Sequence, residues 1–193
     1  MLLTLVTVSV FAGVGVTTIG YYAPLMIASS IFSAIGIGLI YTFKPDTNHS
    51  AWIGYQALAG IGIGLGMQQP LIAVQTILDI SQVPIGTSVI IFLQTLGGAL
   101  FVSIGQNVFS NKLVQNLAKN VPGLDPAIVL NTGATSIQKT IDKQYLAGVT
   151  LAYNDALTES FLVAAIMAAL TIIGSVAIEW KSVKGKKIEM GAA

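Results

Sequence analysis

Charged side chains are confined to short stretches of this 193-residue chain, and that distribution constrains the fold more than any motif does. A helix needs about 20 mostly apolar residues to cross the hydrocarbon core of a membrane. The first charge-free tract is long enough for two crossings, with a turn near Gly20 and Pro24. The tracts that carry none of the nine Lys and eight acidic residues are 1–43, 47–78, 80–111 and 160–178.

We therefore predict an all-α membrane protein, a single domain with five transmembrane helices. A helix satisfies its backbone hydrogen bonds within its own segment, as the interior of a bilayer requires. The alternating apolar and polar residues of a membrane β-barrel do not occur in these tracts. The predicted spans are residues 1–18, 22–43, 52–79, 84–108 and 158–180.

The composition excludes several other classes of protein. Only 9% of residues are charged, against about 25% in an ordinary soluble domain. A net charge of +1 with no Arg cannot provide the clustered basic face that a nucleic-acid binder needs. The chain has no cysteine and only one histidine, His49, so it offers neither a thiolate nor a multi-histidine metal site. With no catalytic constellation either, we expect no enzyme, no metal and no cofactor.

The longest connection, residues 109–157, is predicted to be an extracellular loop. Four Lys residues follow the last span within 181–187, and the excess of basic residues in cytoplasmic segments places the tail 181–193 in the cytosol. Apolar residues near helical spacing over 107–121 predict a short helix at the membrane surface, ended by Pro122-Gly123. Asp125-Pro126 can begin another short helix. We interpret the loop as lying on the membrane surface.

The third span carries small and polar residues on one face of an otherwise apolar helix. At 100° per residue, these residues fall within an arc of roughly 140°. They are Gln56, Gly60, Gly64, Gln68, Gln75 and Asp79.

Two interpretations of this face remain open. Polar groups at membrane depth are costly and usually line a wet cavity, so this helix is predicted to line one, with a bend at Pro70. Alternatively, the glycines allow close helix packing and the glutamines bond across helices. Gln56, Gln68, Gln69 and Gln75 are the candidate cavity contacts, with Gly60, Gly64 and Pro70 as bending or packing positions.

Two further features are weaker. The fourth span has a stripe of small and polar residues, which we interpret as a packing face: Ser88, Thr95, Ala99, Ser103 and Gln106. Asp79 and Glu159 are the acids nearest the spans. A buried membrane carboxylate can relay protons, but at a helix end it more often caps the helix or interacts with its dipole.

Several motifs, in this order and at this spacing, resemble the major facilitator superfamily, and more narrowly the fungal-type fourteen-helix drug:proton antiporters. The resemblance covers essentially the whole chain. The motifs are IGYYAP at 19–24, GYQALAGIGIG at 54–64, QQP at 68–70, GTS at 86–88, Gln94, GG at 97–98 and QN at 106–107.

The resemblance implies that the chain is the C-terminal part of such a transporter, an incomplete C-terminal half containing the last five of fourteen helices. The third span would then occupy the cavity-lining tenth position of the usual twelve-helix scheme. One departure is Thr18, where the family often has a basic residue before the turn. The N-terminal half is absent, and alternating access needs two halves around a central site.

The implied function is efflux of small, mostly apolar compounds in exchange for protons, with the plasma membrane or the vacuolar membrane as the location. Its partners would be the lipid bilayer, a small-molecule substrate and the missing N-terminal half. Three alternatives remain: an iron-chelate (siderophore) uptake carrier, a truncated membrane protein that transports nothing, and a five-helix protein that self-assembles to supply the missing contacts.

Overall fold

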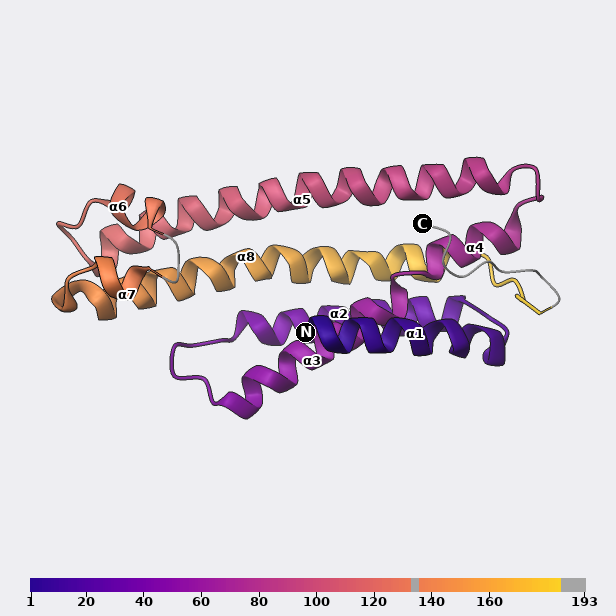
Figure 1. The fold of residues 1–193 in the computed structure, drawn as a ribbon, viewed down its shortest axis with the longest axis horizontal. Coiled ribbons are helices and arrows are strands. Elements are labelled where there is room, and N and C mark those ends of the chain that lie inside the picture. Colours follow the sequence, from indigo (N-terminus) through magenta and orange to yellow (C-terminus); the bar gives the residue numbers. More distant parts are fainter. Residues whose placement is uncertain (133–135, 185–193) are drawn as a thin grey trace.

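The computed structural model describes residues 1–132 and 136–184, and its regular elements in this part of the chain are helices (Figure 1). The confirmed fold class is therefore all-α. The elements are α1 (Leu2–Ile19), α2 (Ala23–Tyr41), α3 (His49–Gly66), α4 (Gln69–Ile77), α5 (Val83–Asn120), α6 (Pro126–Asn131), α7 (Ile137–Thr140) and α8 (Lys143–Ala177).

Five candidate membrane spans are present in the described residues, in agreement with the five spans predicted from the four charge-free tracts. They are formed by α1, α2, the pair α3 and α4 together, α5 and α8. The third predicted span, 52–79, corresponds to His49–Ile77, and the helix breaks within it at Met67 and Gln68, beside the bend predicted at Pro70. Pro70 explains the break: it has no N–H to donate, and its ring would clash with the carbonyl group of Gly66 in an unbroken helix.

Helix α3 lies between α1 and α2, and its glycines make this possible. A Cβ added at Gly60 would lie 2.7 Å from the Met1 carbonyl oxygen, and one at Gly64 would lie 2.6 Å from that of Leu5. On the opposite face, a Cβ at Gly62 would overlap the Ser33 backbone of α2. Gly66 faces Ser29 of α2 in the same way, so the pairs Gly60/Gly64 and Gly62/Gly66, each at i, i+4 spacing, let two neighbouring helices approach closely.

Helix α8 packs between α2 and α5 in the contacts of the described residues. Hydroxyl groups join it to α2: Ser30 Oγ lies 2.8 Å from Ser175 Oγ, and Thr171 Oγ1 donates to Ser30 Oγ at 2.9 Å. Ser30 and Ser175 are buried. Short polar side chains of this kind can hydrogen-bond between membrane helices, where no water is available to satisfy them.

Helices α5 and α8 are far longer than a bilayer requires. With 38 and 35 residues, they extend for about 57 and 52 Å, whereas the hydrocarbon core is about 30 Å thick. Together with α6 and α7, their outer ends form a compact unit at one end of the molecule, here named the helical cap (residues 109–157) (Figure 1).

Most of the segment predicted to be a loop, residues 109–157, is therefore helical in the described part of the chain, and its location outside the cell at the membrane surface stays a prediction. Residues 107–120 do not form a separate surface helix but continue α5, since nothing before Val121-Pro122-Gly123 interrupts the helix. The cap has its own apolar core, in which Leu113, Leu117 and Val149 are fully buried. The predicted start at Asp125-Pro126 is confirmed, with Asp125 Oδ1 accepting from Ala127 N at 2.9 Å.

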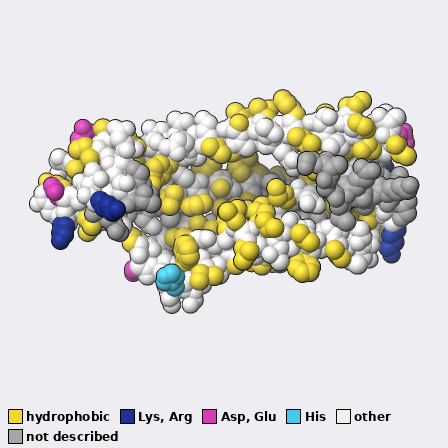
Figure 2. Space-filling model, viewed as in Figure 1, with side chains coloured by type: hydrophobic (Ala, Val, Ile, Leu, Met, Phe, Trp, Pro, Cys, Tyr) yellow, Lys and Arg dark blue, Asp and Glu magenta, His cyan; other side chains and the backbone are white. Residues whose placement is uncertain are grey.

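Charged side chains lie towards the two ends of the molecule, and its middle is apolar in the view shown (Figure 2). The cap is at one end, and the α1–α2 and α4–α5 turns are at the other (Figure 1). Residues 185–193, most of the predicted cytosolic tail, are outside the described part of the chain.

Candidate functional site

The break between α3 and α4 places two adjacent glutamines in different environments. Gln68 is exposed, whereas Gln69 is fully buried. Gln69 Nε2 donates to the Leu65 carbonyl oxygen at 2.9 Å, but its Oε1 has no hydrogen-bond partner among the described residues. A buried acceptor without a partner is costly, and it is a feature of sites that bind another group.

The predicted polar face of the third span is divided by this break. Gly60 and Gly64 are buried against α1, as the packing interpretation expects. Gln56 and Gln75 are half-buried, on opposite sides of the break along the chain. The structure therefore does not bring all four candidate glutamines onto one continuous helix face.

The two candidate acids lie towards opposite ends of the bundle and cannot act as a pair. Asp79 is exposed in the α4–α5 turn, where its backbone carbonyl accepts from Gln82 N at 2.8 Å. Glu159 lies on α8 near the cap, with one oxygen 2.6 Å from Lys112 Nζ on α5. Glu159 thus has a structural partner that the sequence did not identify.

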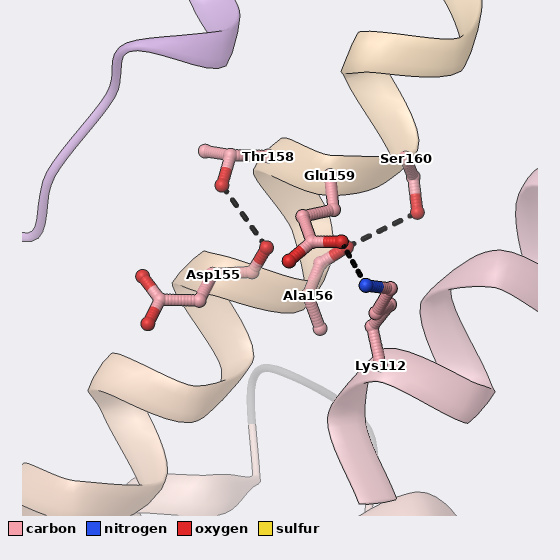
Figure 3. Close-up of polar contacts among 6 residues, drawn as sticks. All are labelled: Lys112, Asp155, Ala156, Thr158, Glu159 and Ser160. Carbon is pink, nitrogen blue, oxygen red and sulfur yellow. Dashed lines mark hydrogen bonds and ion pairs between the residues drawn. The ribbon is translucent and has the colours of Figure 1, made fainter. Parts of the chain in front are cut away.

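Figure 3 shows this ion pair and its surroundings. The neighbouring hydroxyls bond mainly within α8. Thr158 Oγ1 donates to the Asp155 carbonyl at 3.0 Å, and Ser160 Oγ lies 3.1 Å from the Ala156 carbonyl oxygen and 3.4 Å from that of Gly105 on α5. The Asp155 carboxylate points away from Lys112 (Figure 3). Among residues 1–132 and 136–184, no group of His, Cys, Asp and Glu could hold a metal ion.

A weak signal for the Lys112–Glu159 pair was present in the sequence. Lys112 directly follows the charge-free tract 80–111, and Glu159 directly precedes the tract 160–178. Two spans that leave the membrane at the same level bring such flanking charges together. The two residues are 47 positions apart, so no helical periodicity relates them. Only the packing of α5 against α8 shows that they form a pair.

The membrane-spanning part of α5 is largely unpacked in the described structure. None of residues 83–112 is buried, and a Cβ added at Gly97 or Gly98 would have open space around it. Several polar side chains of α5 are exposed at membrane depth, where contact with lipid is unfavourable. They are Ser88, Gln94, Thr95, Ser103 and Gln106. The packing face predicted for this span therefore has no partner within the described residues.

Fungal efflux proteins match the chain over nearly its whole length. MFS-type efflux pump MFS1 of Arthroderma benhamiae is 53% identical over all 193 residues, which are 36% of its own length. The aspyridones efflux protein of Neocamarosporium betae is 50% identical over 98% of the chain and 34% of its own length. Efflux pump roqT of Penicillium rubens is 46% identical over 95% of the chain and 34% of its own length.

The chain thus spans about a third of the length of these curated relatives. No protein-family model matches it, and no solved structure does.

Proposed function

Because the chain belongs to the major facilitator superfamily as the C-terminal portion of a transporter, we propose that it supplies one side of an efflux pathway for small, mostly apolar compounds. The complete protein would be a fourteen-helix drug:proton antiporter of the plasma membrane. This chain would contribute its last five helices, and the remaining part would complete the substrate cavity. Each of the relatives named above is described as an efflux protein.

The observation that carries this proposal is the exposed Gln68 at the break between α3 and α4. Broken helices in membrane transporters usually lie at substrate sites, because unpaired backbone groups are tolerated only where protein or water can meet them. Beside the break, the buried Gln69 adds an acceptor without a partner. An amide exposed at this depth is unfavourable against lipid and favourable against a polar cavity.

The exposed polar side chains of α5 support the same arrangement. A face that carries Ser88, Thr95 and Ser103 is poorly suited to lipid, but it is suited to a cavity or to another helix. The part of the transporter outside this chain can cover this face, since about two thirds of each relative lies outside the matched segment. We therefore assign this face of α5 to the interior of the complete transporter.

Substitution of Gln68 in the full-length transporter tests the proposal. Gln68→Leu should change resistance to a panel of apolar compounds while leaving the amount of protein at the plasma membrane unchanged. Met67→Leu is the matched control, because Met67 is exposed at the same break but is already apolar. Unchanged resistance to every compound would remove Gln68 from the pathway.

The size of the native product is a separate test. An antibody against residues 181–193 should detect a membrane protein about three times the mass of this chain, since the chain spans about a third of its relatives. A product with the mass of the chain itself would instead support a truncated membrane protein. Efflux by this product would then require an oligomer or a separate partner.

A further inference from the structure

The residues that follow α8 return to the turn between α1 and α2. Val183 N donates to the Gly20 carbonyl oxygen at 3.0 Å, and Tyr21 forms an isolated antiparallel bridge with Ser182. The Tyr22 hydroxyl donates to the backbone carbonyl of Glu179. We name residues 179–184 the C-terminal clasp, because they attach the end of α8 to this turn.

Side-chain packing reinforces the attachment. Val183 is only 4% exposed, although it lies in an extended segment after the last helix. It packs with Val16 of α1, Ala23 of α2, and Ile72 and Ala73 of α4. The clasp thus completes a small apolar core to which all three helices contribute.

Tyr22 occupies the centre of this junction. It is fully buried, and burial raises the pKa of its phenol, so the hydroxyl stays protonated and can keep donating to Glu179. A buried tyrosine hydroxyl usually requires such a partner. The backbone of the clasp therefore satisfies a polar group that the helices alone would leave unpaired.

Gly20 ends α1 at the position where the clasp crosses the α1–α2 turn. Its φ of +83° lies in the left-handed region that favours glycine, and it ends α1 with its N–H bonded to the Val16 carbonyl. A Cβ at this position would lie 2.7 Å from Cε of Lys184. The backbone conformation therefore favours glycine where the clasp crosses, whereas the flexible Lys184 side chain can move away from an added Cβ.

The position of α1 depends on this junction. Helix α1 packs mainly on α3, and α3 separates most of α1 from α2. We propose that the C-terminal clasp holds the α1–α2 turn against α4 and against the end of α8. The clasp, the turn, α4 and the end of α8 then move as one body during transport. The joint movement during transport rests on the proposed efflux function, whereas the contact between the clasp and the α1–α2 turn does not.

This chain contains no cysteine, so two introduced cysteines are the only ones within it, and any cysteines in the remaining part of the full-length transporter are first replaced by serine. Tyr21 and Ser182 are opposite one another in an antiparallel bridge, which places their Cα atoms about 4.5–5.5 Å apart, within the range of a disulfide. Tyr21→Cys with Ser182→Cys should cross-link readily in membranes. Transport by the full-length protein should be unchanged after oxidation, because the clasp stays closed throughout.

A weakened clasp provides the sharper test. Val183→Asp puts a carboxylate into the apolar core, so transport and clasp closure should fall by about tenfold or more. In the triple variant that also carries the two cysteines, oxidation should restore transport and thermal stability. Val183→Asp with Tyr21→Cys alone is the control, and oxidation should not rescue it.

The outcomes separate the two proposals. Failure of the disulfide to form, loss of transport on cross-linking, or no rescue of the Val183→Asp variant would each overturn the clasp. If the cross-link forms and restores thermal stability in a protein that exports none of the compounds, the clasp stands and the efflux function fails.

Discussion

Lys112 Nζ lies 2.6 Å from a Glu159 carboxylate oxygen, and this ion pair joins α5 to α8 at the base of the helical cap. The two side chains are 39% and 35% exposed, so the pair should contribute less than about 1 kcal/mol to stability. Its more important consequence concerns proton coupling, because Glu159 already has a cationic partner.

We expect Glu159→Gln to leave efflux dependent on the proton gradient. The variant should lower the thermal denaturation midpoint by less than about 4 °C, as expected for a loss below 1 kcal/mol in a chain of this size. Glu179→Gln is a suitable control, since Glu179 forms a second exposed pair with Lys181 at the other end. Efflux that no longer responds to pH, at normal expression, would instead assign Glu159 to proton transfer.

The glycines of α3 that pack against α1 and α2 should tolerate no side chain. Gly62→Ala would force α3 away from the Ser33 backbone, and overpacking of this kind costs about 1–3 kcal/mol. Gly97→Ala on α5 is the matched control, because an added Cβ there has open space within the described residues. The thermal stability of the purified protein in detergent measures both, and equal stability of the two variants would contradict the packing of α3 on α2.

The hydroxyl cluster between α2 and α8 should contribute little per bond. Ser30→Ala and Ser175→Ala are each expected to cost about 0.6 kcal/mol, the average for hydrogen bonds between membrane helices. A double-mutant cycle should give a coupling free energy of similar size, because the two oxygens lie 2.8 Å apart. Strictly additive effects would show that the hydroxyls do not bond to each other.

A cavity in the core of the helical cap should destabilise the cap locally. Leu117→Ala removes a fully buried side chain and should cost about 2–5 kcal/mol. Hydrogen exchange should then accelerate over residues 109–157 and stay slow in α2 and α3. Val114→Ala, on the exposed side of the same helix, should leave exchange unchanged; acceleration throughout the bundle would show that the cap has no core of its own.

The spans were predictable because lipid imposes a simple rule on charge. Four charge-free tracts, the first of them long enough for two crossings, account for the five candidate spans. The same rule does not predict where a helix ends outside the membrane. The predicted fourth span ends at residue 108, but α5 continues to Asn120, because a helix can continue into water for as long as its apolar residues find a partner.

The candidate site was only partly predictable. Pro70 indicated a disturbed helix, but the distribution of Gln68 and Gln69 between surface and interior depends on how the chain leaves the break. The clasp had no sequence signal, because Val183 and Tyr22 are 161 positions apart and belong to no common pattern. Contacts between distant irregular segments follow from the completed fold and not from local periodicity.

The placement of α3 between α1 and α2 has a consequence for biosynthesis. Within this chain, α1 and α2 are made before α3, yet each of them packs against α3. These two helices must therefore stay apart in the bilayer until α3 has been inserted. A substitution that strengthened their direct association would block the entry of α3, so it would reduce the yield of assembled protein without weakening any contact of the finished structure.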